Sequence, residues 1–406
     1  MILRAKFVVP DSKTVIENGI IEIDGDYIIN VGRYSKTSNK KTLDLGNTIV
    51  IPGLVNAHCH LEFSALQGKV RNGIPLHKWI LRCIELQKLW KREDWIKSVR
   101  MGLQMLAKNG ITSVGDVCRR NYLLNILKID QIRKVVFYEA INTSNTTAHI
   151  TLREVEKTLQ NIRPTNTFTL GVSPHSPYTV SQKLYKLLKN LSENYKVPLA
   201  THISETKEEV EFLMHRKGAL AELIKYTNIS YPFYKVPMLT PIEYLRKMGI
   251  LSRNVNLIHA NYLSRNDINI IADSGASVTF CPGSHEYFHH DRHPIAKLLT
   301  KGITVALGTD SLASNIDLSI LREMAIVRKI YRIAPHHIFD MATSNGAKAL
   351  FRNKRLGLIR KKYIADLTCL TITRNIRKQD IFDFLCSNPK DVAMTMVGGK
   401  IIYNKT

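Results

Sequence analysis

Two histidines, two residues apart, end the first strongly apolar segment of the chain. This segment ends in Asn56-Ala57-His58-Cys59-His60. Side chains two apart in an extended strand point to the same side, so His58 and His60 can bind one ion together while Cys59 faces the opposite side. Imidazole nitrogen is a common ligand of zinc and other transition metals. The spacing therefore predicts part of a metal site.

A second polar group follows the apolar segment near residue 200, which ends in Thr201-His202-Ile203-Ser204-Glu205. His202 could complete a set of three histidines. Glu205 follows where the chain leaves the strand and would stand beside the metal as a proton carrier. The alternative for Glu205 is an acid in the first turn of the next helix, where the helix dipole favours a negative charge.

Two later apolar segments end in Leu257-Ile258-His259-Ala260 and Gly308-Thr309-Asp310-Ser311. Asp310 offers a hard oxygen ligand that can also accept a proton from metal-bound water. His259 would orient that water or help to deprotonate it. Both residues are therefore expected to be catalytic, and Asp310 is also an expected metal ligand.

His175 lies in Pro174-His175-Ser176-Pro177-Tyr178 and is better placed to touch the substrate than the metal. The alternative is a histidine that caps or braces its own loop. The preceding segment, residues 168–173, contains no lysine that could be carboxylated to bridge two metals. One metal ion is the simpler assignment.

These residues together predict hydrolysis at an electron-poor ring carbon that bears an amine. A divalent ion bound by three imidazoles and one carboxylate keeps a position for water and lowers its pKa towards roughly 7. Glu205 would protonate the neighbouring ring nitrogen, Asp310 would pass a proton to the departing ammonia, and His259 would stabilise the attacking hydroxide. Zn²⁺ fits this ligand set, and Fe²⁺ or Mn²⁺ would also be held.

The elements that must position these residues are short apolar runs separated by longer amphipathic segments, a pattern typical of βαβ units. Eight runs can be counted, at residues 48–56, 111–116, 134–140, 168–173, 198–203, 255–260, 277–282 and 304–311. Eight parallel strands close a barrel, and five of these runs end in polar residues at the barrel face where active sites are built.

The intervening segments suit helices, for instance residues 76–108, 181–195, 265–273 and 318–332. A longer interval, residues 206–254, carries the helix-breaking stretches Tyr231-Pro232-Phe233 and Lys235-Val236-Pro237. This interval could supply a loop over the site.

Both ends of the chain are strand-like, with alternating segments before residue 50 and again after residue 356. We therefore predict an α/β protein with a (β/α)8 TIM-type barrel at residues 51–355. Residues 1–50 and 356–406 are expected to form one small, discontinuous β-sandwich domain.

The composition is that of a globular protein, with one unusual property, a formal net charge of +24. A nucleic-acid or membrane partner is not favoured, because the basic residues are spread along the chain without interleaved aromatics. Six scattered cysteines and the absence of an 18-residue apolar run are typical of a cytoplasmic protein. The expected partner is a small molecule, and a homo-oligomer stays open.

With these residues in hand, the sequence resembles the amidohydrolase superfamily, from Pro52-Gly53-Leu54 through the motifs above to Ala365-Asp366-Leu367. It is similar to the mononuclear branch of methylthioadenosine and S-adenosylhomocysteine deaminases and chlorohydrolases. The resemblance implies His58, His60, His202 and Asp310 as metal ligands, Glu205 as proton shuttle, His259 beside the metal, and His175 at the substrate.

The stretch Ala57-His58-Cys59-His60-Leu61-Glu62-Phe63-Ser64 resembles aminodeoxyfutalosine deaminases, which serve menaquinone biosynthesis. Glu62 distinguishes this stretch and is a candidate substrate-binding residue; the alternative is a structural acid. One departure is Cys281-Pro282-Gly283-Ser284-His285, where many relatives have an arginine at the position of Gly283. Substrate contacts from this loop are therefore not carried over.

The leading interpretation is a deaminase of a 6-aminopurine nucleoside, with aminodeoxyfutalosine as the favoured substrate. The enzyme alternatives are an S-adenosylhomocysteine, methylthioadenosine or adenosine deaminase, a triazine chlorohydrolase or aminohydrolase, and a cyclic amidase, which usually needs two metals. The alternative from another class is a silent barrel that acts as a basic scaffold.

Overall fold

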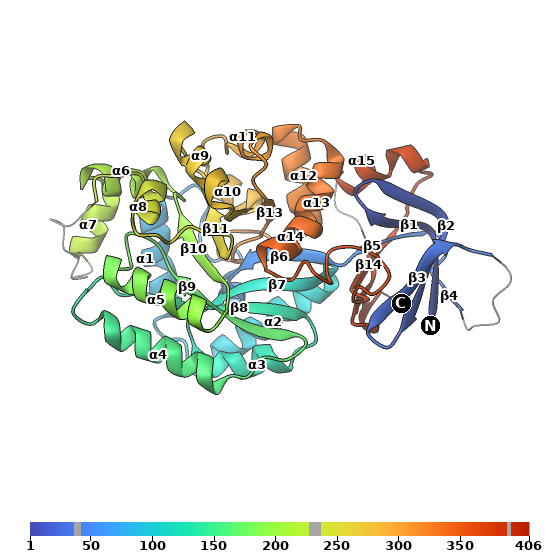
Figure 1. Ribbon diagram of the computed structural model, residues 1–406, viewed down its shortest axis with the longest axis horizontal. Coiled ribbons are helices and arrows are strands. Elements are labelled where there is room, and N and C mark those ends of the chain that lie inside the picture. Colours follow the sequence, from blue (N-terminus) through green and yellow to red (C-terminus); the bar gives the residue numbers. More distant parts are fainter. Residues whose placement is uncertain (36–41, 227–236, 388–390, 406) are drawn as a thin grey trace.

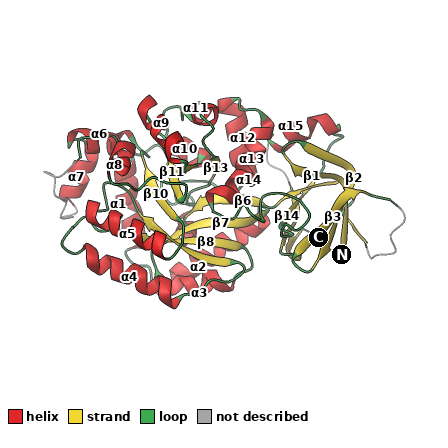
Figure 2. Ribbon diagram, in the orientation of Figure 1, coloured by secondary structure: helices red, strands yellow, loops and turns green. Residues whose placement is uncertain are grey.

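The computed structural model describes residues 1–35, 42–226, 237–387 and 391–405. It has a large part of strands surrounded by helices and a smaller sheet at one end that contains both chain termini (Figure 1). Figure 2 shows the strands of the large part inside a layer of helices. The predicted barrel and the β layer made from both chain ends are confirmed.

The barrel contains eight parallel strands among the described residues, paired in chain order. They are β6 (Leu54–Cys59), β7 (Ile111–Cys118), β8 (Arg133–Ala140), β9 (Phe168–Pro174), β10 (Leu199–Ile203), β11 (Val255–His259), β12 (Ser277–Phe280) and β13 (Val305–Leu307). Almost all of their residues are buried, as expected for a parallel sheet covered by helices.

Hydrogen bonds after the last strand close the barrel against the first. The backbone amides of Thr309 and Asp310 both donate to the carbonyl oxygen of His58, at 3.1 Å. The side chain of Asn56 donates from Nδ2 to Thr309 Oγ1 at 2.7 Å. These bonds bring the candidate ligands His58 and Asp310 together, although they lie 252 positions apart in the sequence.

The helices and 3-10 turns cover the strands and connect them. They are α1 (Leu76–Gln87), α2 (Arg92–Lys108), α3 (Leu124–Ile129), α4 (Ala148–Asn161), α5 (Gln182–Asn194), α6 (Lys207–His215), α7 (Ala219–Tyr226), α8 (Pro241–Lys247), α9 (Arg265–Ser274), α10 (Pro282–Tyr287), α11 (Ile295–Thr300), α12 (Ile320–Tyr331), α13 (Pro335–Ala342), α14 (Ser344–Ala349), α15 (Ile381–Leu385), η1 (Leu61–Leu66), η2 (Asn121–Leu123) and η4 (Lys378–Asp380). No helix within the described ranges has the length and apolar character needed to cross a membrane.

The terminal strands form one mixed sheet in the order β16-β15-β14-β5-β1-β2-β3, with β4 beside β1. Their bounds are β1 (Ile2–Asp11), β2 (Thr14–Asp24), β3 (Tyr27–Arg33), β4 (Thr42–Asp44), β5 (Thr48–Pro52), β14 (Leu367–Thr371), β15 (Val392–Val397) and β16 (Lys400–Asn404). The sheet encloses its own small apolar core, which includes Leu3, Ile21, Val50 and Met396. The expected small β domain from both chain ends is therefore present, and its described strands form one continuous sheet.

The first predicted run, residues 48–56, is divided between the two sheets, which corrects the prediction of a single barrel strand. β5 pairs with β14 and β1 in the terminal sheet, and only β6 belongs to the barrel. The chain changes sheets at Gly53, where a Cβ atom would collide with the side chain of Thr112. An apolar run alone does not reveal such a change of sheet, because both halves are buried.

The predicted helix over residues 76–108 is two helices, α1 and α2, which is a second correction. The break lies at residues 88–91, and the backbone amide of Lys91 donates to Oδ2 of Asp94 at 2.8 Å at the start of α2. In the interval 206–254 the structure places α6, α7 and α8, while residues 227–236, including Tyr231-Pro232-Phe233, lie outside the described ranges.

Candidate active site

His58 and His60 leave the end of β6 with their rings close together. Their ring centroids are 4.9 Å apart and the rings are nearly perpendicular. Both ring nitrogens of His58 are buried and have no hydrogen-bond partner. A buried polar atom of this kind normally has a partner, so His58 is suited to hold an ion.

His202, at the end of β10, faces this pair. Its Nε2 lies 3.2 Å from Nε2 of His60. One ring nitrogen from each of His58, His60 and His202 falls within a group whose atoms all lie within 4.8 Å of one another. The other nitrogen of His202, Nδ1, lies 3.3 Å from the carbonyl oxygen of His175, which fixes the ring orientation.

Asp310 follows β13 and divides its two carboxylate oxygens between different partners. Oδ2 accepts hydrogen bonds from Ser284 Oγ at 2.8 Å and from Ser314 Oγ at 2.7 Å. Oδ1 lies 3.5 Å from Nε2 of His58 and 3.8 Å from Nε2 of His60. One oxygen is thereby anchored, and the other is directed at the histidines.

Burial keeps the imidazoles of His60 and His202 neutral near pH 7, which is the state that binds metal. Desolvation lowers the pKa of His60 to about 3 and holds the pKa of His202 well below its usual value. For Asp310, burial alone would raise the pKa, but the facing His58, His259 and His60 hold it well below its usual range. The carboxylate is therefore ionised.

Glu205 and His259 stand beside the group of candidate ligands. Nε2 of His259 lies 3.7 Å from Oε1 of Glu205. One nitrogen of His259 also falls within 4.8 Å of ligand atoms of His58 and Asp310. Burial, with added repulsion from Asp310 and Glu209, raises the pKa of Glu205 well above its usual value. Glu205 can therefore carry a proton at neutral pH, as a general acid must.

The backbone at the strand ends adopts the left-handed conformation at several non-glycine residues. The φ angles are 48° at Ser204, 71° at His259 and 58° at Asp310. Such positions cost roughly 1–3 kcal/mol each and gather at functional sites. Here they occur where the chain turns off β10, β11 and β13 beside the candidate ligands.

His175 is braced by its own loop and also reaches the site. Its Nδ1 lies 2.6 Å from Thr179 Oγ1 and 3.1 Å from Ser176 Oγ. Its ring centroid is 5.0 Å from that of His202. The structure therefore supports both readings of this residue, because the brace leaves Nε2 for another partner.

Glu62 lies in η1 and is buried beneath an arginine. Arg120 Nη1 donates to its Oε1 at 2.7 Å, and the Arg120 guanidinium lies 3.1 Å from the centroid of the Trp95 ring. Burial raises the pKa of Glu62 to about 7, although Arg120 opposes the shift. This ion pair makes the structural role of Glu62 the stronger one, at the edge of the cavity described next.

A cavity of about 410 Å³ joins these residues and is lined by His60, Glu62, His175, His202, Glu205, His259 and Asp310. This volume lies in the range of roughly 300–1,000 Å³ that small-molecule sites occupy. Sequence reasoning did not identify its apolar wall, which comes from α1 and includes Leu76, Trp79, Ile80 and Ile84. Arg119 and Glu139 also line the cavity and were missed.

The backbone amide of Gly283 donates to Oε2 of Glu323 at 2.6 Å. A Cβ atom at Gly283 would come within 2.5 Å of Asn315 Nδ2 and 2.6 Å of Glu323 Oε1. An arginine side chain therefore has no room here, and this loop supports Asp310 through the neighbouring Ser284.

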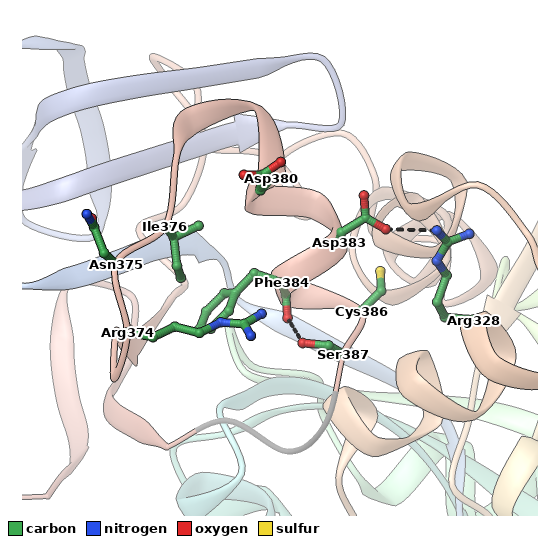
Figure 3. Close-up of a pocket in the computed structure, with 9 residues that line it drawn as sticks. All are labelled: Arg328, Arg374, Asn375, Ile376, Asp380, Asp383, Phe384, Cys386 and Ser387. Carbon is green, nitrogen blue, oxygen red and sulfur yellow. Dashed lines mark hydrogen bonds and ion pairs between the residues drawn. The ribbon is translucent and has the colours of Figure 1, made fainter.

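A different cavity, of about 510 Å³, lies between α12 and the segment around α15 (Figure 3). An ion pair, Arg328 Nη2 to Asp383 Oδ1 at 2.8 Å, crosses it. None of its lining residues belongs to a group of metal-ligating side chains in the described ranges. Within the described ranges, the groups of side chains that could hold a metal ion lie at the carboxyl ends of the barrel strands.

The chain is similar to known proteins over nearly its whole length. The model of the amidohydrolase family matches residues 49–402. The chain belongs to the amidohydrolase family. It is therefore a hydrolase that acts on carbon–nitrogen bonds.

Several relatives of this amidohydrolase have been described. It is 28% identical over 382 residues to a 5-methylthioadenosine/S-adenosylhomocysteine deaminase from Pyrococcus furiosus, and the alignment covers 91% of this chain and 84% of the relative. It has the fold of an aminofutalosine deaminase from Helicobacter pylori, with a TM-score of 0.86, 22% identity, and coverage of 99% and 100%. It also has the fold of a zinc-containing atrazine chlorohydrolase from Arthrobacter aurescens, with a TM-score of 0.84, 20% identity, and coverage of 99% and 95%.

The donor set of this amidohydrolase fits a divalent metal ion. His58, His60, His202 and Asp310 supply three imidazole nitrogens and one carboxylate oxygen, and the nitrogens of His58 have no hydrogen-bond partner. Zinc, the ion in the structure of the chlorohydrolase, binds such mixed nitrogen and oxygen donors.

Proposed function

We propose that this amidohydrolase is a metal-dependent deaminase of 6-aminopurine nucleosides. The observation that carries the proposal is the convergence of His58, His60, His202 and Asp310 with Glu205 and His259 on one cavity. The first four residues would hold one divalent ion, for which Zn²⁺ is the first candidate and Fe²⁺ or Mn²⁺ are alternatives. Similarity to nucleoside deaminases supports the substrate class.

The bound ion would supply Lewis acidity that makes water a stronger acid. Glu205 would give its proton to the purine N1, because burial keeps the carboxyl protonated. Protonation of N1 makes the adjacent C6 more electrophilic before water attacks it. Glu205 is then ionised and would accept the remaining proton of the C6 hydroxyl as the carbon–oxygen double bond forms, which restores the protonated carboxyl for the next turnover.

Asp310 would accept a proton through Oδ1, because its other oxygen is occupied by Ser284 and Ser314. That proton then goes to the C6 amine, which leaves as ammonia while the product keeps an oxygen at C6. His259 faces Glu205 and would hold the attacking water by a hydrogen bond. Each proton of the reaction thus has a named donor and acceptor.

Within this class we propose aminodeoxyfutalosine as the favoured substrate, and hence a role in menaquinone biosynthesis. The stretch around Glu62 and the apolar wall from α1 support it, because the wall suits a bulky apolar group on the sugar. The alternatives are S-adenosylhomocysteine, methylthioadenosine, 5′-deoxyadenosine and adenosine, whose deaminases include relatives of this chain.

The test is ammonia release from a panel of these nucleosides by the zinc-loaded enzyme, with atrazine as a further arm. Turnover of a 6-aminopurine nucleoside is expected, with the highest kcat/KM for aminodeoxyfutalosine. Turnover of atrazine alone would favour the chlorohydrolase alternative. Inactivity on the whole panel, with no bound metal and salt-dependent binding to duplex DNA, would favour a silent basic scaffold.

A further inference from the structure

The cavity has two sides with different chemistry. Glu205, His259 and Asp310 follow β10, β11 and β13, and they carry the proton transfers of the proposed reaction. Glu139 and His175 lie at the ends of β8 and β9. The proposed reaction gives Glu139 no role, although it lines the cavity.

Glu139 is a largely buried carboxylate whose Oε1 has no hydrogen-bond partner. Of the carboxylates that line the cavity in the described ranges, it alone has such an enclosed, unpartnered oxygen. Glu62 by contrast accepts a hydrogen bond from Arg120, and Asp310 accepts two from serines. Because buried acceptors in native proteins are nearly always satisfied, the bound ligand is expected to supply the missing donor.

A second metal ion does not fit this place, although carboxylate and ring atoms of Glu139, His175 and His202 lie within 4.8 Å of one another. Nε2 of His202 faces His60, and its Nδ1 faces a backbone carbonyl oxygen. His202 therefore has no nitrogen for another ion. A hydrogen-bond donor of the substrate is the partner that we consider for Glu139.

The sugar of a nucleoside provides that donor. The ring nitrogens of a 6-aminopurine are acceptors, and its one donor group is the amine that leaves. This amine must face Glu205 and Asp310, on the other side of the cavity. A carboxylate on the side of β8 and β9 is left with the sugar hydroxyls.

We propose that Glu139 accepts a hydrogen bond from a ribose hydroxyl of the substrate and thereby selects ribonucleosides over analogues that lack this hydroxyl. The inference rests on the proposed function, since it takes the substrate to be a nucleoside. It adds a specificity-determining residue that makes contact with the sugar and takes no part in proton transfer.

The test compares kcat/KM for adenosine, 2′-deoxyadenosine and 3′-deoxyadenosine in the zinc-loaded wild type, E139Q and E139A. The wild type is expected to prefer adenosine over at least one deoxy analogue by roughly 10²-fold or more, because the unpaired carboxylate rejects it. E139A should reduce that preference to a few fold, whereas the amide oxygen of E139Q still accepts a hydrogen bond and should retain part of the preference. Both variants should keep the metal content. Glu93→Gln, an exposed acid on α2, is the matched control and should behave as wild type.

Equal kcat/KM values for the three nucleosides in the wild type would overturn the inference, as would a preference retained in full in E139A. Loss of a metal equivalent in E139Q would overturn it in favour of a ligand role. If no nucleoside is deaminated, the proposed function fails, and Glu139 is judged by calorimetric binding of inosine against 2′-deoxyinosine and 3′-deoxyinosine. A preference for inosine that disappears in E139A would still support the sugar contact, and one that stays in E139A or never exists would overturn it.

Discussion

Hydrogen bonds from two neighbouring serines orient the carboxylate of Asp310. Ser284 and Ser314 occupy Oδ2, so only Oδ1 faces His58 and His60. Groups that orient a ligand in this way typically change metal affinity or activity by 10- to 100-fold when removed. The geometry of the candidate metal site therefore depends on serines that bind no metal themselves.

Glu205→Gln tests the proton carrier. The amide keeps the size of the side chain but cannot deliver a proton, so kcat should fall by roughly 10²- to 10⁴-fold. Zinc content should stay near that of the wild type, because Glu205 is not among the proposed ligands. Steady-state ammonia release and elemental analysis measure the two quantities.

Glu211→Gln, an exposed acid on α6, is the matched control and should keep wild-type kcat. A Glu205→Gln enzyme that retained full activity would contradict the role of Glu205. A variant that lost its zinc would indicate a ligand instead of a proton carrier.

At this scale the sequence predicted the residues that have a spacing signal or end an apolar run. His58 and His60 are two apart, and His202, His259 and Asp310 each end such a run. Glu139 occupies the same penultimate position of its own run, residues 134–140, and was nevertheless missed, since its unpartnered oxygen becomes visible only when β8 is placed beside β9. Lone acids of this kind carry no local signal.

Gly53 is the decisive residue at the scale of elements, because the chain passes there from β5 in the terminal sheet to β6 in the barrel. Gly53→Ala should destabilise the protein by about 1–3 kcal/mol, since the added methyl group collides with Thr112. Urea denaturation of the metal-free protein measures the change in the free energy of unfolding.

Gly32→Ala on β3 is the matched control, because a Cβ atom there meets nothing within 4 Å. This control should leave the free energy of unfolding nearly unchanged. Equal effects of the two substitutions would contradict the view that close packing at Gly53 fixes the passage between the sheets.

Most barrel elements could be predicted from periodicity, because short runs such as residues 168–173, with Phe168, Leu170 and Val172, are separated by longer amphipathic segments. The division of residues 48–56 could not, since β5 and β6 are equally buried. The break between α1 and α2 was missed as well, because amphipathic character continues on both sides of it. Consequently the wall that α1 forms over the cavity was also missed.

The two parts of the molecule are joined by a buried ion pair. Arg133, which begins β8, donates from Nε to Asp366 Oδ2 at 2.7 Å and from Nη2 to Oδ1 at 3.1 Å. Asp366→Asn should lower the free energy of unfolding by about 3–5 kcal/mol, because it leaves the guanidinium buried without its counter-charge. Denaturation curves of the metal-free protein give this value.

Asp44→Asn, which breaks the exposed pair with Arg4, is the control and should change the free energy of unfolding by less than about 1 kcal/mol. An effect of Asp366→Asn as small as that of the control would show that the buried pair does not join the barrel to the terminal sheet.

The whole molecule should lose stability in acid because several histidines are buried in the neutral form. His293 is one that is not a proposed ligand: its Nε2 lies 3.0 Å from the carbonyl oxygen of His259, and its ring stacks on Phe280 at 3.9 Å. Burial lowers its pKa to about 3. Between this value and the unfolded pKa near 6.5, the unfolded chain binds the proton and the folded chain does not, so stability falls as the pH falls.

The free energy of unfolding of the metal-free protein should therefore decrease steadily from pH 6.5 towards pH 4. His293→Gln keeps a donor for the carbonyl oxygen of His259 and removes the titrating ring, so its pH profile should be flatter than that of the wild type. Parallel profiles would assign the acid sensitivity to other groups.

The central claim is that distant parts of the chain form a single metal site. Anomalous X-ray scattering at the zinc edge, from crystals of the zinc-loaded protein, tests it most directly. The account predicts one strong peak at roughly 2.0–2.2 Å from nitrogens of His58, His60 and His202 and from Asp310 Oδ1. A peak elsewhere, or a second peak of equal height beside Glu139, would contradict it.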